Sequence, residues 1–111
     1  MTQLEAMALT YVIEAAVAAA LAPAFGRAAL MCALAAVVGT TVTHPVLWAV
    51  FYDAQAAFGP LVTPALEAGV IVAETFAYRL LATSRWDEAA LFSVLANAAS
   101  WWGGEAIYAL T

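Results

Sequence analysis

The sequence predicts an all-α integral membrane protein, a bundle of four helices that each cross the bilayer. Of the 111 residues, 67% are hydrophobic and 10% are charged, whereas a soluble domain carries about 25% charged residues. A soluble fold of this length needs many polar side chains on its surface, and this chain has too few. Its apolar runs are continuous over about 20 residues, which is the length of a membrane-spanning helix. Spanning strands would alternate apolar and polar residues, so we do not expect a barrel.

Helix-breaking residues divide the apolar sequence into four runs. The first run ends in the segment 22–26, which contains Pro23 and Gly26. His44 and Pro45 interrupt the second run, and Gly59-Pro60 precedes the third. We therefore expect a single transmembrane domain over residues 1–111, with spans at about 4–21, 27–43, 61–81 and 89–110.

The stretch 46–58 is rich in aromatic residues and holds one acid, Asp53. Aromatic side chains collect where a membrane meets water. The stretch is predicted to be an interfacial segment between the second and third helices, or else a continuation of the second helix.

The three arginines predict the orientation. Arg27 lies in the first connection, and Arg79 and Arg85 flank the third, where Ser84 is placed to cap the fourth helix. Positive charge marks the cytoplasmic side of a membrane protein. We expect a bacterial inner-membrane protein with both termini outward and connections 1–2 and 3–4 cytoplasmic.

The two halves of the chain align without gaps at an offset of about 60 residues. Such a match predicts two repeated helical hairpins in the same orientation, although alanine-rich sequences also align by chance. The matched pairs are Glu14 with Glu74, Ala29 with Ala89, Leu34 with Val94, and Thr40 with Ser100.

Every predicted span contributes polar groups near mid-depth, where an ionised carboxylate facing lipid costs several kcal/mol. We expect these groups to face the bundle interior. Two glutamates there would share a proton, so the cluster is a candidate site for a proton, a cation or a small polar ligand. The structural alternative is that protonated glutamates hydrogen-bond across helices and hold the bundle together. The candidates are Glu14, Thr40, Thr43, His44, Glu74, Tyr78, Asn97 and Ser100.

His44 has its own alternatives. The following proline frees backbone carbonyls, so His44 could line a cavity, or it could simply be wet at the end of a helix. An imidazole in a membrane can also be one axial ligand of a haem or of a chlorophyll-type pigment. We expect no other cofactor and no metal site.

Several functions are excluded by composition and pattern. The net charge is -5 with no lysine, so the chain lacks a basic patch for nucleic acid. Cys32 lies in an apolar run and has no cysteine to pair with. No serine–histidine pair or phosphate-binding glycine loop is present, so we do not expect an enzyme.

Small residues recur four apart and let helices approach closely, within the bundle or against another chain. We expect the partners to be the lipid bilayer and other membrane subunits, or further copies of the chain. The spaced pairs are Ala15 and Ala19, Ala18 and Ala22, Ala35 and Gly39, Gly69 and Ala73, and Ala96 and Ser100.

The order of the polar motifs resembles a pattern in uncharacterised small bacterial multi-pass membrane proteins. It consists of Glu14, the stretch from Thr40 to Pro45, Glu74 with Tyr78, and Asn97 with Ser100. The resemblance implies a four-helix architecture and no activity. Our leading functional hypothesis is a non-enzymatic accessory subunit that joins a larger complex or self-associates. The alternatives are a proton or cation transporter element using Glu14 and Glu74, and a pigment or haem subunit using His44.

Overall fold

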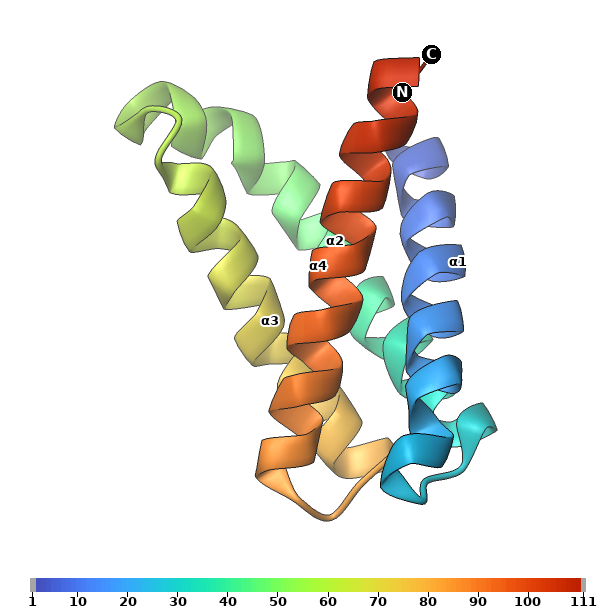
Figure 1. Ribbon diagram of the computed structural model, residues 1–111. Coiled ribbons are helices and arrows are strands. Elements are labelled where there is room, and N and C mark those ends of the chain that lie inside the picture. Colours follow the sequence, from blue (N-terminus) through green and yellow to red (C-terminus); the bar gives the residue numbers. More distant parts are fainter. Residues whose placement is uncertain (1, 111) are drawn as a thin grey trace.

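The computed structural model describes residues 2–110, and this part of the chain contains four α-helices and no strand (Figure 1). The prediction of an all-α, four-helix protein is confirmed. Two segments, Gln3–Phe25 and Ala29–Phe58, are long and apolar enough to cross a membrane. The elements are α1 (Gln3–Leu21), the 3-10 helix η1 (Ala22–Phe25), α2 (Ala29–Phe58), α3 (Val62–Leu81) and α4 (Trp86–Leu110).

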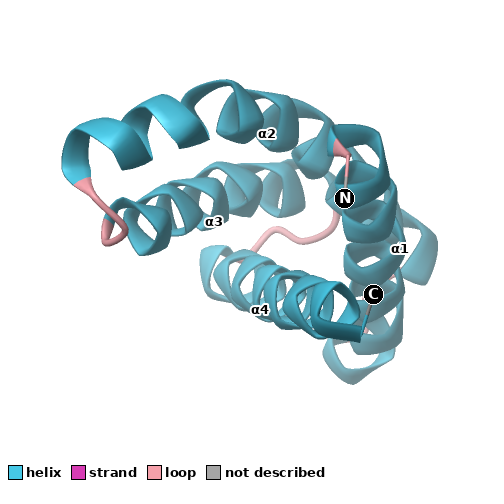
Figure 2. Cartoon of the chain, turned by 90° about the horizontal axis from the view of Figure 1, so that it is seen from above, coloured by secondary structure: helices cyan, strands magenta, loops and turns pink. Residues whose placement is uncertain are grey.

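The helices form a ring in which each helix packs against its two neighbours in sequence, and α4 closes against α1 (Figure 2). One end of the bundle, here called the turn end, holds η1 and the short connection between α3 and α4 (Figure 1). The opposite end, the terminal end, holds the start of α1, the finish of α4 and the connection from α2 to α3. Both connections that contain arginine therefore lie at the same end, as their order in the chain requires.

Helix α2 corrects the expected interruption at His44-Pro45 and confirms the alternative that segment 46–58 continues the second helix. It continues through Pro45 as one helix of 30 residues, so the predicted interfacial segment 46–58 is the second half of α2. Proline removes one backbone donor and bends a helix without necessarily ending it. Beyond this point α2 lies along α3 and leads away from α1 (Figures 1 and 2).

Two glycines end helical segments with backbone angles that other residues rarely adopt. Gly26 follows η1 with φ of 66°, and Gly59 follows α2 with φ of 83°. A side chain at positive φ is strained, whereas glycine is not. These residues set the turns from which α2 and α3 begin.

The start of α4 differs in detail from the prediction, because Thr83 and not Ser84 supplies the hydroxyl. Thr83 Oγ1 accepts a hydrogen bond from the Arg85 backbone N–H (3.1 Å) and donates one to Glu88 (3.0 Å). Asp87 also accepts from the Glu88 backbone N–H. Acidic side chains in a first turn suit the positive end of the helix dipole.

The distribution of side chains is inverted relative to a soluble bundle. Most of the buried apolar residues are alanines, and the buried set also includes two glutamates and an asparagine. The large aliphatic and aromatic side chains lie mainly outside. On α2 they form an exposed stripe at every fourth residue: Leu30, Leu34, Val38, Val42, Val46 and Val50.

Near the turn end the interior is filled by packed apolar side chains. The ring of Phe92 lies 5.3 Å from that of Phe25 and 5.5 Å from that of Tyr78, measured between centroids. Ala18, Ala22 and other fully buried small residues surround these rings. This apolar plug leaves polar groups to the other half of the bundle.

Candidate functional site

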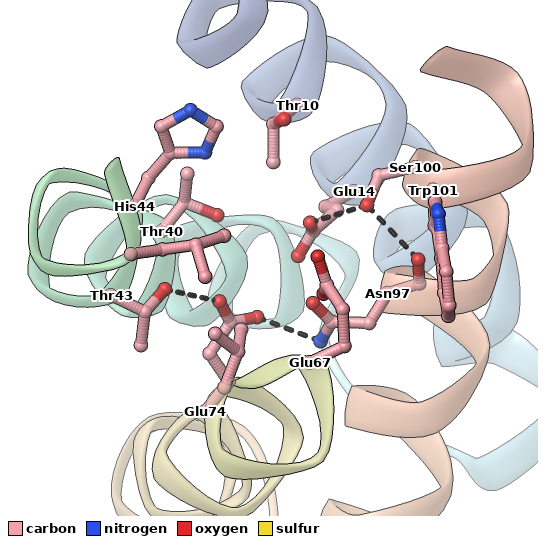
Figure 3. A pocket seen from close by; sticks show the side chains of 12 residues that line it. Thr10, Glu14, Thr40, Thr43, His44, Glu67, Glu74, Asn97, Ser100 and Trp101 are labelled. Atoms are coloured by element: carbon pink, nitrogen blue, oxygen red, sulfur yellow. Dashed lines mark hydrogen bonds between the residues drawn. The ribbon is translucent and has the colours of Figure 1, made fainter. Parts of the chain in front are cut away.

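A polar cavity of about 90 Å³ lies between the four helices (Figure 3). On every helix its lining runs from mid-length toward the terminal end, which places it directly beyond the apolar plug. A cavity of this size with polar walls has room for several water molecules. It is lined by Thr10, Glu14, Thr40, Thr43, His44, Leu47, Glu67, Val70, Glu74, Asn97, Ser100 and Trp101.

Glu74 is fixed by one hydrogen-bond donor from each neighbouring helix. Thr43 Oγ1 on α2 donates to Glu74 Oε2 (2.6 Å), and Asn97 Nδ2 on α4 donates to Glu74 Oε1 (3.0 Å). Asn97 Nδ2 also donates to the Ser93 carbonyl at 2.8 Å, which holds the amide in place. A Cβ atom on Gly39 would lie 3.0 Å from Glu74 Cγ, so glycine at this position makes room for the carboxylate side chain.

Glu14 is less completely bonded than Glu74. Ser100 Oγ on α4 donates to Glu14 Oε2 (2.7 Å), while Glu14 Oε1 is buried and has no hydrogen-bond partner. Each glutamate therefore binds a hydroxyl group of the other helical hairpin. Glu14 on α1 binds Ser100 on α4, and Glu74 on α3 binds Thr43 on α2. Residues 60 apart share burial as well: Glu14 and Glu74 are both buried, and so are the residues four positions later, Ala18 and Tyr78.

The cavity contains three carboxyl groups, and the imidazole of His44 is the one basic side chain in its lining. Glu14, Glu67 and Glu74 lie close enough for their negative charges to repel one another. The three arginines are at positions 27, 79 and 85, in or beside the connections of the turn end. A buried carboxylate without a cation is costly, so three carboxyl groups beside one imidazole favour the binding of a proton or another cation.

Two further predicted residues line the cavity with unused polar atoms. Thr40 Oγ1 and His44 Nε2 are buried and lack hydrogen-bond partners. The His44 ring stacks on Trp48, with 6.2 Å between the ring centroids. His44 therefore lines a cavity inside the bundle, in agreement with one of the two interpretations of its position.

Tyr78 is the predicted site residue that lies elsewhere. It belongs to the apolar plug, where its ring stacks on Phe92, and its hydroxyl has no hydrogen-bond partner. No hydrogen bond joins Tyr78 to a glutamate among the described side chains. Tyr78 lies one helical turn from Glu74 in the direction of the turn end, away from the cavity.

Sequence reasoning missed Glu67, Thr10 and Ser93. Glu67 precedes Glu74 by seven residues, which places the two on the same face of α3. Thr10 precedes Glu14 by four residues, and Ser93 precedes Asn97 by four. Helical spacing from the recognised polar residues would have identified all three. Ser93 binds the Ile71 carbonyl (2.7 Å) and so joins α4 to α3.

No group of three or more His, Cys, Asp or Glu side chains between residues 2 and 110 is arranged to hold a metal ion. The donor set of the cavity, carboxyl groups with hydroxyls and one amide, is instead suited to proton exchange and to hydrogen bonding with a bound cation.

Comparison with known proteins adds no family: no family model, curated protein or solved structure matches the chain. The functional interpretation therefore rests on the geometry of the cavity.

Proposed function

We propose that the protein spans a membrane with four helices and carries a proton on the Glu14–Glu74 pair, as an element of a transporter. The membrane placement is supported by the inverted burial pattern, because lipid solvates exposed Leu, Val and Phe and water does not. It is also supported by charge placement. Outside the cavity, every charged side chain lies in a connection or toward the end of a helix: Glu5, Arg27, Asp53, Arg79, Arg85, Asp87, Glu88 and Glu105.

The observation that carries the proton proposal is the Glu14 Oε1 atom, which has no hydrogen-bond partner. Glu14 Oε1 is buried in a polar cavity with a second carboxyl group close by and no arginine in the lining. A proton on either carboxyl group removes the repulsion and supplies a donor for the unpaired oxygen. A purely structural hydrogen-bond network would leave fewer buried acceptors unpaired, because each unpaired group costs about 1–3 kcal/mol.

The position of the cavity also favours exchange over static packing. The cavity reaches from the glutamates toward the terminal end, while the apolar plug closes the bundle toward the turn end. In such an arrangement water can carry a proton to the buried carboxyl groups from the terminal end, but not from the turn end. Passage to the other side would require the helices to repack around Phe92 and Tyr78.

The test measures both protonation and flux. Infrared spectroscopy in neutral buffer detects the carbonyl band of a carboxyl group that keeps its proton, because exposed carboxyl groups are ionised there and do not contribute. We expect a band in the wild-type protein that is lost in the double variant Glu14→Gln plus Glu74→Gln. In vesicles that contain a pH-sensitive dye, the same variant should abolish proton entry.

Glu105→Gln is the matched control, because Glu105 is an exposed acid of α4 at the terminal end. It should leave the band and the flux unchanged. Equal infrared spectra and equal proton flux in the wild-type protein and the double variant would refute the proposal.

Membership of a larger assembly remains a prediction with its own support. Half of the spaced small residues are buried inside the bundle, including Ala18, Ala22, Ala35 and Gly39. Gly69 is exposed, and a Cβ atom there would meet nothing within 4 Å. It lines an apolar groove of about 240 Å³ between α2 and α3, into which a neighbouring helix could pack. A stable lone monomer in mild detergent would count against this function.

Haem or pigment binding through His44 also remains a prediction. The buried, unpaired Nε2 atom favours a ligand, but the cavity of about 90 Å³ holds a few waters and not a tetrapyrrole. Visible absorbance in the purified protein would support the idea, and a colourless preparation would end it.

A further inference from the structure

A second pocket, of about 160 Å³, adjoins the central cavity on the side of α2 and α3. Its walls are Leu47, Trp48, Phe51 and Tyr52 from the second half of α2, and Glu67 from α3. Leu47 and Glu67 line the central cavity as well, so the two spaces are neighbours. One carboxyl group thus stands opposite three aromatic side chains.

The aromatic side chains are held by one another. His44, Trp48 and Tyr52 follow at intervals of four on α2, so their rings form a ladder along one face of the helix. Successive rings lie 6.2 Å and 6.4 Å apart between centroids, and the ring of Phe51 meets that of Tyr52 edge-on at 5.3 Å. The continuation of α2 beyond Pro45 places this ladder beside α3.

Glu67 forms no hydrogen bond or ion pair with any residue of the described part of the chain, and it is only partly exposed. The carboxyl group of Glu74 lies close enough to repel its charge. A negative group in a confined pocket with aromatic walls is the arrangement that recognises organic ammonium ions, through charge and through the electron-rich ring faces.

We propose that this aromatic pocket binds an ammonium ion that carries apolar substituents, with its charge against Glu67. A metal cation fits poorly, because the pocket offers one carboxyl group and otherwise mainly aromatic and aliphatic side chains in place of its hydration shell. An alkylated ammonium is weakly hydrated and gains from the same walls. Leu47 also lines the apolar groove between α2 and α3, which gives room for an apolar substituent.

This inference goes beyond the proton site and does not depend on it. The alternative without a ligand is that Trp48 and Tyr52 anchor the protein at the membrane surface, where such residues are common. Anchors would bind a neutral aromatic compound as well as a charged one. The two explanations therefore differ in their dependence on charge.

The experiment compares phenyltrimethylammonium with tert-butylbenzene, its neutral carbon isostere, by calorimetric titration of the purified full chain in detergent micelles, with empty micelles as blank. We expect the cation to bind at least about tenfold more tightly than the isostere, and Glu67→Gln to remove this preference. Trp48→Leu should weaken cation binding by about three- to tenfold.

The matched controls are Glu105→Gln and Trp102→Leu, an exposed acid and an exposed tryptophan of α4. Both should bind the cation as the wild-type protein does. Helical circular dichroism shows whether each variant is folded, and Glu67→Asp, which keeps the charge, should retain the preference even if Glu67→Gln unfolds.

Equal affinity for the cation and the isostere would overturn the inference, as would a preference that survives in folded Glu67→Gln. The double variant Glu14→Gln plus Glu74→Gln distinguishes the two proposals, because it should lose the proton signals and keep phenyltrimethylammonium binding.

Discussion

Thr40 and Thr43 are both buried on α2, yet their hydroxyl groups differ in what they bind. Thr43 donates to Glu74 at 2.6 Å, whereas Thr40 Oγ1 has no hydrogen-bond partner. Replacement of threonine by valine keeps the shape of the side chain and removes only the hydroxyl. The two variants therefore compare, on the same helix, a threonine that bonds another helix with one that does not.

We predict that Thr43→Val lowers the free energy of unfolding by about 1 kcal/mol, the usual value of such bonds inside helical membrane proteins. Thr40→Val should change it by less than about half of that, because no bond is lost. Unfolding in mixed micelles, followed by circular dichroism, measures both. Equal losses in the two variants would show that the Thr43–Glu74 bond does not stabilise the bundle.

At this scale the sequence identified residue types well and pairings poorly. Glu14, Glu74, Asn97 and Ser100 were expected in one cluster, and hydrogen bonds connect Glu74 with Asn97 and Glu14 with Ser100. The choice between Thr40 and Thr43 depends on the rotation of α2 against α3, which no local pattern reveals. Tyr78 was misplaced for a similar reason, since a tyrosine near a glutamate packs equally well as an apolar ring.

The elements are joined at the turn end by an ion pair between the two hairpins. Arg27 Nε, before α2, donates to Glu88 Oε1 in the first turn of α4 at 2.8 Å. This hydrogen bond, together with the positive charge of Arg27, holds the pKa of Glu88 below its ordinary value. The pair closes the ring of helices where η1 and the connection from α3 to α4 meet.

The sign of the pH dependence follows from that lowered pKa. Because the folded state holds Glu88 ionised more firmly than the unfolded chain, the ion pair stabilises the fold above the ordinary glutamate pKa of 4.5. The contribution is lost as the pH falls through the lowered value.

We therefore predict that acid lowers the thermal unfolding temperature of the wild-type protein more than that of Glu88→Gln. The two unfolding temperatures should converge below pH 4.5. Asp87, whose pKa is lowered by Arg85, is present in both proteins and cancels from the comparison. Parallel curves over the whole range would mean that the Arg27–Glu88 pair adds nothing.

Helix ends were predictable where glycine and proline occur together, and they were not predictable where a proline occurs alone. The turn at 22–26 and the break at Gly59-Pro60 appear as expected, because a glycine at positive φ ends each segment. At Pro45 the sequence left open whether the helix ends or continues, and α2 continues through it. Whether a helix ends at a single proline depends on tertiary packing, which the local sequence does not contain.

For the whole molecule, the orientation in the membrane is the prediction with the widest consequences. The turn end holds the exposed Arg85 together with Arg27, so the rule that positive charge stays inside places it in the cytoplasm. The cavity of the proposed proton site would then open toward the outer face.

Cysteine labelling tests the orientation in a Cys32→Ala background. Ser84→Cys lies in the connection at the turn end, and Ala57→Cys lies near the end of α2 at the terminal end; both positions are exposed. A membrane-impermeant maleimide should label Ala57→Cys in intact spheroplasts and Ser84→Cys only after lysis. The reverse pattern would invert the orientation, and labelling of both positions only after lysis would argue against membrane insertion.

The sequence alone determined the all-α, four-helix fold, because its continuous apolar runs have helical length and helix breakers separate most of them. It also indicated that Glu14 and Glu74 would lie inside, since an ionised group facing lipid is costly at that depth. The tertiary structure decided what those groups meet. It added Glu67, assigned Thr43 and Ser100 as donors, removed Tyr78, and set the aromatic residues beyond Pro45 against α3. Burial is a property of each residue and can be inferred from its neighbours in sequence. Contact across helices depends on how all four pack at once.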